Sequence, residues 1–303
     1  MSETILEAKH LYFSYDNDQT HSLNDFSLKI EKGKKIAVMG SNGSGKSTFF
    51  LCCNGIHRPS SGNLFFHGKE IGYSRRELLE LRSNIGIVFQ DPDNQLFSAS
   101  VYEEISFGIL NLGVSKDTAR QAVSNIISKL EITPFQEKPT HALSGGQKKQ
   151  VAIADILVMQ PEILILDEPA ASLDPKHTDI VRASIDQLSD NDMTILIATH
   201  DADYAFAWAD EVVLIHEGSV LKSGTPLDVF SDTEALARTN LRPPSVFPLF
   251  QTLCRKHILS KELPVPRTLT ELEQRLEALP DDAKKHPVNK QSPKANHIFI
   301  HIK

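Results

Sequence analysis

A glycine-rich segment between a short apolar run and a helical pattern constrains the fold more than any other feature of the chain. The segment is Gly40-Ser41-Asn42-Gly43-Ser44-Gly45-Lys46-Ser47-Thr48. Glycines let backbone N–H groups converge on phosphate oxygens, and a helix N-terminus adds partial positive charge. We expect Lys46 to reach the β- and γ-phosphates and the Ser47 hydroxyl to bind Mg²⁺. A glycine turn without a ligand is the alternative, but the flanking strand and helix favour a nucleoside-triphosphate site.

Short apolar runs alternate with helical patterns through roughly the first 220 residues. The runs are residues 35–39, 85–89, 163–166 and 194–198. Continuous apolar strands are typical of a parallel sheet that is buried on both faces. Segments such as residues 178–188 are long enough for crossover helices, so the alternation predicts an α/β fold. Residues 98–143 break the alternation with a helical pattern and no strand, which predicts a helical insertion.

Composition and charge exclude several classes of protein. Of the 303 residues, 40% are apolar, enough for a packed core, and the formal net charge of −7 argues against a nucleic-acid partner. The longest charge-free stretch, residues 243–254, contains prolines and is too short to span a bilayer. The N-terminus lacks the pattern of a signal peptide. The cysteines (Cys52, Cys53 and Cys254) cannot form a disulfide framework. We therefore expect a soluble, cytoplasmic chain.

Two carboxylates directly follow the apolar run of residues 163–166. Asp167 and Glu168 follow this predicted strand directly, and α/β proteins bind ligands at the carboxyl ends of their strands. Asp167 is placed to hold Mg²⁺ through water, and Glu168 to orient or deprotonate an attacking water. Solvated acids at a strand end are the alternative. With the phosphate loop upstream, the pair favours a hydrolase.

A third motif points to a family. Leu143-Ser144-Gly145-Gly146-Gln147 follows the phosphate loop and precedes the two carboxylates. Alone it would be a serine helix cap, but in this order it resembles the signature of the ATP-binding cassette (ABC) superfamily. The resemblance implies an α/β P-loop NTPase cassette with a mainly parallel sheet, an antiparallel β portion and a helical insertion. It also implies that the signature grips the γ-phosphate of ATP held by a partner subunit.

Four further positions match the family, and their roles are implied by the resemblance. Gln90 resembles the Q-loop glutamine that senses Mg²⁺ and the attacking water, and His200 resembles the switch histidine. Asp174 resembles the end of the D-loop at a dimer interface. Tyr15 resembles the aromatic residue that stacks on adenine, with Tyr12 as its competitor. The expected catalytic residues are thus Glu168, His200 and Gln90, and the expected Mg²⁺ ligands are Ser47, Gln90 and Asp167.

Three further segments of the sequence resemble those of the ATPases of energy-coupling-factor importers, especially the cobalt/nickel type. Residues 89–97 and 101–108 are similar to their extended Q-loop and the segment after it, and residues 199–205 to their switch region. The resemblance implies ATP and Mg²⁺ as cofactors and a peripheral location on the cytoplasmic face of the membrane. The implied partners are a second ATPase subunit, a transmembrane coupling subunit and a substrate-binding membrane subunit. Leu96 and Phe97, near acidic Asp91 and Asp93, would suit a groove for a partner helix; an ordinary surface loop is the alternative.

Two positions depart from the family pattern, and several functional alternatives stay open. Gln150 stands where many relatives have Arg, and Asp155 stands where they have Arg or Gly. The cargo could be cobalt, nickel or a vitamin, because an ATPase subunit does not touch it, and homodimer and heterodimer are both compatible with the intact motifs. The other classes are a soluble ABC ATPase acting on ribosomes or DNA and a binding module without turnover.

The expected domain organisation has three parts. Residues 1–235 form the ATP-binding domain, with the helical insertion at about 98–143; residues 236–280 form a C-terminal helical extension, and residues 281–303 a flexible tail. The alternating pattern of residues 297–303 could add an edge strand. His297 and His301 would then lie about 13 Å apart, at ~3.3 Å per residue, which is too far for one metal ion.

Overall fold

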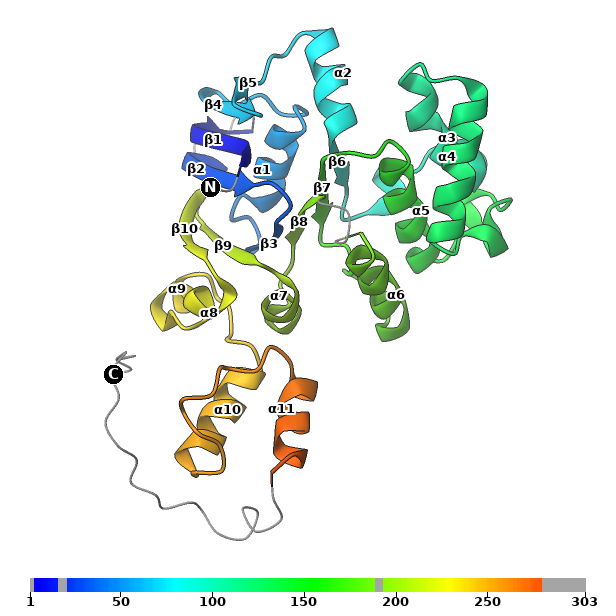
Figure 1. Cartoon of the computed structure of the whole chain (residues 1–303). Helices are drawn as coiled ribbons and strands as arrows, with labels where there is room; N and C mark the ends of the chain where they lie inside the picture. Colours follow the sequence, from blue (N-terminus) through cyan, green and yellow to red (C-terminus); the bar gives the residue numbers. More distant parts are fainter. Residues whose placement is uncertain (1–2, 16–20, 189–192, 280–303) are drawn as a thin grey trace. The chain divides into compact units, whose positions relative to one another are not determined.

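The computed structural model describes residues 3–15, 21–188 and 193–279, and these divide between two compact units (Figure 1). The first unit ends at Arg242 and the second begins at Pro243. The boundary expected at residue 235 falls inside helix α9 (Thr233–Arg238), which packs on α8 (Pro226–Phe230), so it lies seven residues too early. The predicted tail and edge strand lie outside the described residues.

A six-stranded sheet forms the centre of the first unit, with the strand order β10-β9-β3-β8-β7-β6. Its strands are β3 (Lys35–Met39), β6 (Ile85–Val88), β7 (Ile163–Asp167), β8 (Thr194–Ala198), β9 (Glu211–His216) and β10 (Ser219–Gly224). All neighbouring pairs are parallel except the β9–β10 hairpin. Each of the four apolar runs is a strand of this sheet, so the predicted α/β class is confirmed. All residues of β6, β7 and β8 are buried, as continuous apolar runs require.

A second sheet is antiparallel, with the strand order β2-β1-β4-β5. Its strands are β1 (Thr4–Phe13), β2 (Leu23–Glu31), β4 (Ser61–Phe66) and β5 (Lys69–Glu70). One apolar cluster joins residues of both sheets and of helix α1 (Lys46–Cys53). Within it the rings of Phe26 and Phe49 lie 4.4 Å apart, centroid to centroid. Cys52 and Cys53 are buried in the same cluster, as expected for small core residues.

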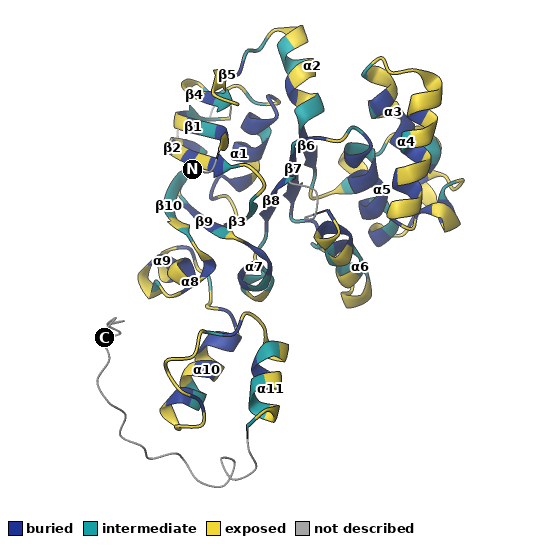
Figure 2. Cartoon of the chain, in the orientation of Figure 1, coloured by how far each residue is buried: buried dark blue, intermediate teal, exposed yellow. Residues whose placement is uncertain are grey.

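Helices alone connect β6 to β7, which confirms the helical insertion. They are η1 (Pro92–Asn94), α3 (Val101–Asn111), α4 (Lys116–Lys129), η2 (Thr133–Phe135), η3 (Thr140–Ala142) and α5 (Gly145–Leu157). Figure 2 shows the inner faces of α3 and α4 buried and their outer faces exposed. In α4 the buried residues are Ala119, Val123, Ile126 and Ile127, which recur at helical spacing.

The remaining helices flank the central sheet or belong to the second unit. The first group is α2 (Arg75–Asn84), α6 (Pro175–Asp186), α7 (Ala202–Trp208), α8 and α9. The second unit contains α10 (Val246–Arg255) and α11 (Leu269–Glu277), which contact each other. Among the described residues, no helix combines the length and the apolar character needed to cross a bilayer.

Candidate active site

The glycine-rich loop joins β3 to α1 and lies against the backbone of two distant segments. Gly40, Gly43 and Gly45 have φ values of 154°, 76° and 109°, which L side chains rarely adopt. A Cβ added to Gly40 would lie 2.2 Å from the carbonyl oxygen of Ile215, and one added to Gly45 would lie 2.5 Å from that of Ser22. At Gly43 the same atom would meet open space. Packing therefore demands glycine at two of these positions, and backbone conformation favours it at the third.

Lys46 is buried at the first position of α1 and points back across the loop. Its Nζ donates hydrogen bonds to the carbonyl oxygens of Gly40 at 2.8 Å and Ser41 at 3.0 Å. Burial lowers the pKa of Lys46, while the charges of Glu168 and Asp167 act in the opposite direction. An ammonium group has three N–H donors. Two of them are used on the loop, so one N–H and the positive charge remain available to an anionic ligand.

The loop also contains a buried hydroxyl that suits an anionic ligand. Within the described part of the chain, the Oγ of Ser44 is buried without a hydrogen-bond partner. The carbonyl oxygen of Ser44 accepts from the N–H of Gly218 at 2.9 Å, which fixes the loop from behind. Buried polar atoms are nearly always satisfied, so this hydroxyl fits a site for phosphate oxygens. The N-terminus of α1 adds favourable partial charge at the same place.

Tyr15 lies next to the helix that follows the loop. Its hydroxyl is 3.2 Å from the Oγ1 of Thr48, and the side chain is 43% exposed, so part of the ring is open to a ligand. The ring meets His57 edge-on at a centroid distance of 5.3 Å. Tyr12, the competitor, packs against His21 instead, at 5.7 Å. The position beside the phosphate loop thus belongs to Tyr15.

Two aromatic neighbours of Tyr15 had no recognisable sequence signal. The rings of Phe13 and His57 stack at 4.7 Å with an interplanar angle of 16°. Burial lowers the pKa of His57, which favours a neutral ring there. Together the three rings form an aromatic wall, and such a wall accepts a planar base through stacking.

The two carboxylates expected to bind Mg²⁺ and to activate water lie at the carboxyl end of β7. Asp167 is buried, and it pairs with Ala198 at the end of the neighbouring strand β8. Glu168 adopts a left-handed backbone conformation with φ 46°, and its N–H donates to the carbonyl oxygen of Ala198 at 3.1 Å. The Nε2 of His200 lies 2.7 Å from the Oε1 of Glu168. The ends of two parallel strands therefore bring the expected base and the expected switch residue into contact.

The three expected Mg²⁺ ligands line one hollow of about 570 Å³. They are Ser47 from α1, Gln90 after β6 and Asp167 from β7. A hydroxyl, an amide oxygen and a carboxylate are the hard oxygen donors that Mg²⁺ takes together with substrate phosphates. The donor set therefore fits the ion. Gly145, at the start of α5, lines the same hollow.

The signature residues form the N-terminus of α5. Ser144 caps the helix: its Oγ accepts from the N–H of Gln147 at 3.3 Å, and the Oε1 of Gln147 accepts from the N–H of Ser144 at 3.1 Å. Capping uses the hydroxyl as an acceptor, so its O–H remains a donor for phosphate. A Cβ added to Gly146 would lie 2.2 Å from the ring of His177, so close packing on α6 requires glycine there. The helix-cap and anion-site interpretations are thus compatible.

The carboxylate of Asp174 is engaged by the first turn of α6. It accepts from the N–H of His177 at 3.0 Å, and its other oxygen lies 2.6 Å from the Nδ1 of the same residue. These hydrogen bonds, the backbone one first, lower the pKa of Asp174. The preceding Ser172 has φ 61°, a left-handed conformation that turns the chain into the helix. The segment predicted as the D-loop is therefore a tight, internally bonded turn.

Sequence reasoning missed a buried lysine behind the Q-loop. Lys149 in α5 is 1% exposed, and its Nζ donates to the carbonyl oxygens of Phe89 at 3.0 Å and Gln90 at 2.7 Å. Burial lowers the pKa of Lys149 to about 8, although the charges of Asp91 and Asp167 oppose this shift. A lysine shortly before the apolar helical residues 151–154 was the available signal. Lys149 fixes the backbone that carries Gln90.

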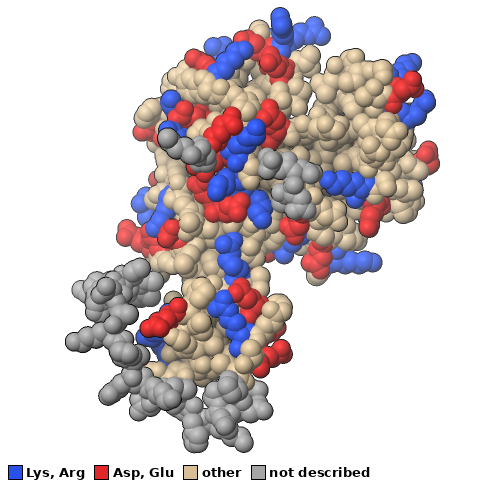
Figure 3. All heavy atoms as spheres, in the orientation of Figure 1, with Lys and Arg blue, Asp and Glu red and all other residues tan. Residues whose placement is uncertain are grey.

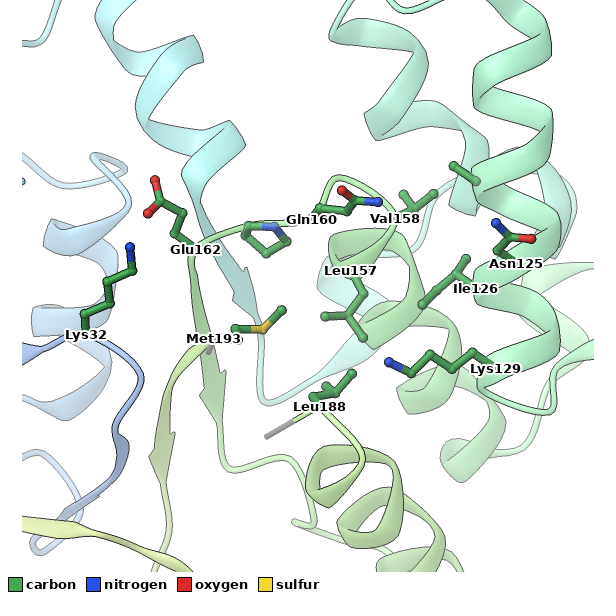
Figure 4. A pocket seen from close by; sticks show the side chains of 12 residues that line it. Lys32, Asn125, Ile126, Lys129, Leu157, Val158, Gln160, Glu162, Leu188 and Met193 are labelled. Carbon is green, nitrogen blue, oxygen red and sulfur yellow. The ribbon is translucent and has the colours of Figure 1, made fainter. Parts of the chain in front are cut away.

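A second hollow lies at the other end of the parallel strands (Figure 4). Its lining includes Lys32 before β3, Glu162 before β7, Met193 before β8 and Lys129 of α4, with apolar side chains between them. No residue predicted for the active site lines it. This hollow is therefore separate from the candidate active site, whose two carboxylates lie at the carboxyl end of β7.

Comparison with known proteins agrees with this geometry. The family described as ABC transporter matches residues 23–171. The energy-coupling factor transporter ATP-binding protein EcfA of Methanocaldococcus jannaschii is 45% identical over 252 residues, which is 83% of this chain and 90% of that protein. The corresponding protein EcfA3 of Clostridium perfringens is 45% identical over 257 residues, 84% of this chain and 90% of its own length. The chain belongs to the energy-coupling-factor group of ABC transporter ATPases.

Solved structures similar to this ATPase show the same fold. The structure of cbiO1 from Clostridium perfringens, described as part of the ABC transporter complex cbiONQ, is 44% identical with a TM-score of 0.70. The match covers 82% of this chain and 99% of that one. A dimeric ATP-binding cassette bound to ADP and Pi has a TM-score of 0.67 at 24% identity, which concerns the fold alone. The expected P-loop NTPase cassette is therefore confirmed.

Proposed function

We propose that this ATPase binds ATP and Mg²⁺, hydrolyses the ATP in a dimer, and powers an energy-coupling-factor importer for a transition-metal ion. The observation that carries the proposal is the contact of 2.7 Å between Glu168 and His200, beside the buried cation of Lys46. A carboxylate held against an imidazole, next to a phosphate cradle, is equipped to activate water.

The proposal assigns a role to each residue of the site. Lys46 and the loop N–H groups bind and orient the β- and γ-phosphates. Glu168 orients the attacking water and accepts its proton, while His200 holds that carboxylate and contacts the γ-phosphate. Tyr15 stacks on the adenine ring. Mg²⁺, when bound by Ser47, Gln90 and Asp167, neutralises phosphate charge.

The proposed dimer completes each site with a second subunit. The hydroxyl of Ser144 and the N–H groups of Gly145, Gly146 and Gln147 begin α5, where partial positive charge attracts a phosphate. Supplied by the partner, this helix end would grip the γ-phosphate from the side opposite Lys46. The arrangement makes the closure of the dimer depend on ATP, and its reopening on hydrolysis.

An exposed aromatic pair near the Q-loop supports a membrane partner. Phe97 is 67% exposed and Phe107 is 49% exposed, and their rings meet edge-on at 4.9 Å. Large exposed aromatics that contact each other are typical of docking surfaces. Asp93, expected to attract a basic helix, is already paired with Lys148 at 2.5 Å, so the apolar pair carries most of the proposed contact. A transmembrane coupling subunit would dock here, at the cytoplasmic face of the membrane.

The charge distribution disfavours the alternative of an ABC ATPase acting on nucleic acid. On the face drawn in Figure 3, acidic and basic side chains of the described residues are interspersed. A nucleic-acid site would need a positive surface, and the formal net charge is −7. For the cargo, cobalt or nickel is favoured over a vitamin by the likeness to cbiO1 of the cbiONQ complex.

The test uses the full chain reconstituted with its membrane subunits in liposomes. Glu168→Gln should lower ATP turnover by about 10²–10⁴ while ATP binding stays within about twofold, because the amide keeps the shape but cannot accept a proton. The matched control is Asp179→Asn, an exposed carboxylate of α6 that is expected to leave turnover unchanged. Near-normal hydrolysis by Glu168→Gln would contradict the assigned base. Uptake of a vitamin, with no uptake of radioactive cobalt or nickel, would contradict the assigned cargo.

A further inference from the structure

The segment that carries Gln90 is fastened along one side of helix α5. Lys148 binds Asp93 through a contact of 2.5 Å, and Lys149 donates to the carbonyl oxygens of Phe89 and Gln90. These contacts join the Q-loop to the helix whose N-terminus is the signature. Movement of the Q-loop must therefore move α5 or break these bonds.

Gln95 adds a second fastening, made entirely by its side-chain amide. Its Oε1 accepts from the N–H of Phe89 at 3.3 Å. Its Nε2 donates to the carbonyl oxygen of Ala152 at 2.9 Å and to the Oδ2 of Asp155 at 3.2 Å. Because both ends of the amide are used, its orientation is fixed by Asp155 and Ala152 on one side and by Phe89 on the other.

Asp155 is one of the two positions at which this chain departs from the family pattern. Its carboxylate is partly buried on α5, and burial raises its pKa to about 7; the hydrogen bond from Gln95 opposes the shift, and the charge of Glu104 adds to it. Glu104 is buried in α3, where its Oε2 accepts from the N–H of Phe97 at 3.0 Å and from that of Ser98. An Arg or Gly at position 155 could not accept the hydrogen bond of Gln95.

The other charged groups near α5 are engaged or lie on other faces. Asp91 and Asp93 belong to the Q-loop segment, Lys148 and Lys149 to α5 itself, and His177 packs on Gly146 at the far end of the helix. The charged residues of α4, which are Lys116, Asp117, Arg120 and Lys129, are exposed, and β6 contains only apolar residues and glycine. Glu103 of α3 and Lys176, Asp179 and Asp186 of α6 are exposed, and Arg182 of α6 binds Asp201. Glu104 is therefore the charged neighbour that acts on Asp155.

We propose that Asp155 is a positioning residue of the ATPase: through Gln95 it holds the start of the Q-loop on α5, so that Gln90 faces the nucleotide. The proposal rests on the proposed function and adds to it a residue that touches neither ATP nor Mg²⁺. A carboxylate accepts the N–H of Gln95 more strongly than a neutral acid does. Inside the folded chain Asp155 stays buried whether or not Gln95 is bound, so ionisation favours this hydrogen bond even though the buried charge lowers the stability of the whole fold. The hold on the Q-loop therefore tightens as pH rises through neutrality, and weakens below it.

Two substitutions separate the hydrogen bond from the charge. Asp155→Ala removes the acceptor but keeps a residue that favours helix, whereas Asp155→Asn keeps an acceptor oxygen that does not titrate. The first measurement is amide hydrogen exchange of residues 89–97 in the full chain at pH 6 and pH 8, corrected for intrinsic rates. The second is kcat and KM for ATP at the same pH values.

In the wild-type chain the amides of residues 89–97 should be better protected from hydrogen exchange at pH 8 than at pH 6, and kcat should likewise be higher at pH 8. At pH 8, Asp155→Ala should lose about fivefold in protection, the equivalent of one hydrogen bond, and severalfold in kcat. KM should stay within about twofold, because Lys46 and the phosphate loop are untouched. Asp155→Asn should recover most of the protection and show little dependence on pH.

Three outcomes would overturn the proposal. The amides of residues 89–97 could be as well protected in Asp155→Ala as in the wild type, or Asp155→Asn could lose as much protection as Asp155→Ala. The third is a protection that depends on pH equally in all three proteins. Hydrogen exchange reports the fastening whatever the chain transports. If the membrane subunits failed to respond to ATP, the proposed function would fail, while the exchange results would still decide the role of Asp155.

Discussion

Replacing Asp155 by asparagine should stabilise the folded chain, and by more at high pH than at low pH. Burial raises the pKa of Asp155 from 3.8 to about 7. Between these values the folded state binds more protons than the unfolded state, so its stability falls as pH rises from about 4 to 7. An asparagine at this position has no proton to release, so the variant escapes this loss.

The magnitude follows from the shift. One pKa unit corresponds to about 1.36 kcal/mol, and the interval between pH 5 and pH 8 contains roughly two of the three units, about 2.7 kcal/mol. The side chain keeps some contact with solvent, so this value is a ceiling and about 1–2 kcal/mol is expected. The free energy of unfolding of Asp155→Asn, minus that of the wild type, should thus increase by this amount from pH 5 to pH 8.

Urea unfolding monitored by Trp208 measures this difference, because the chain has a single tryptophan and it lies in the first unit. Asp117→Asn, which removes an exposed carboxylate, is the matched control and should change stability by less than about 0.5 kcal/mol at either pH. An Asp155→Asn difference that is the same at pH 5 and pH 8 would refute the assignment of a buried, titrating carboxylate.

Three pairs of substitutions test the geometry of the site. Gly45→Ala should abolish nucleotide binding or folding, because its Cβ would lie 2.5 Å from a backbone carbonyl, whereas Gly43→Ala faces open space and should cost only about 1–2 kcal/mol of stability, as measured by thermal unfolding. Tyr15→Ala should weaken ATP binding about tenfold in a fluorescence titration, and Tyr15→Phe by less than about twofold, since stacking needs the ring and not the hydroxyl. Arg182 binds Asp201, the residue after His200, through a contact of 2.5 Å. Arg182→Gln should lower kcat severalfold without raising KM, and an equal loss in Asp201→Asn would support their pairing.

The central sheet could be predicted because its strands are buried on both faces. Such strands appear in the sequence as unbroken apolar runs, and residues 163–166 and 194–198 are examples. The end of the first unit could not be placed in the same way. No proline or glycine interrupts the chain at residue 235, and helix α9 continues through it; the break comes at Pro243 and Pro244.

The parts of the site that carry motifs were predictable, and the parts that support them were not. Ser47, Gln90 and Asp167 lie far apart in the sequence, yet each belongs to a recognisable motif, and the sheet brings them to one hollow. Lys149 and Gln95 act through contacts with the backbone of other elements. Such long-range contacts depend on how helices pack, which local patterns of residues do not encode.

The phosphate loop gains its shape from chain segments that contain no motif. Its glycines lie against the carbonyl oxygens of Ser22 and Ile215, and Gly218 donates a hydrogen bond to its backbone. The loop is thus ordered by folding, and nucleotide binding does not have to supply the entropy of ordering it. Association with ATP can therefore approach the rate set by diffusion and charge. Substitutions at the turn of residues 215–218 would slow it without touching the nucleotide.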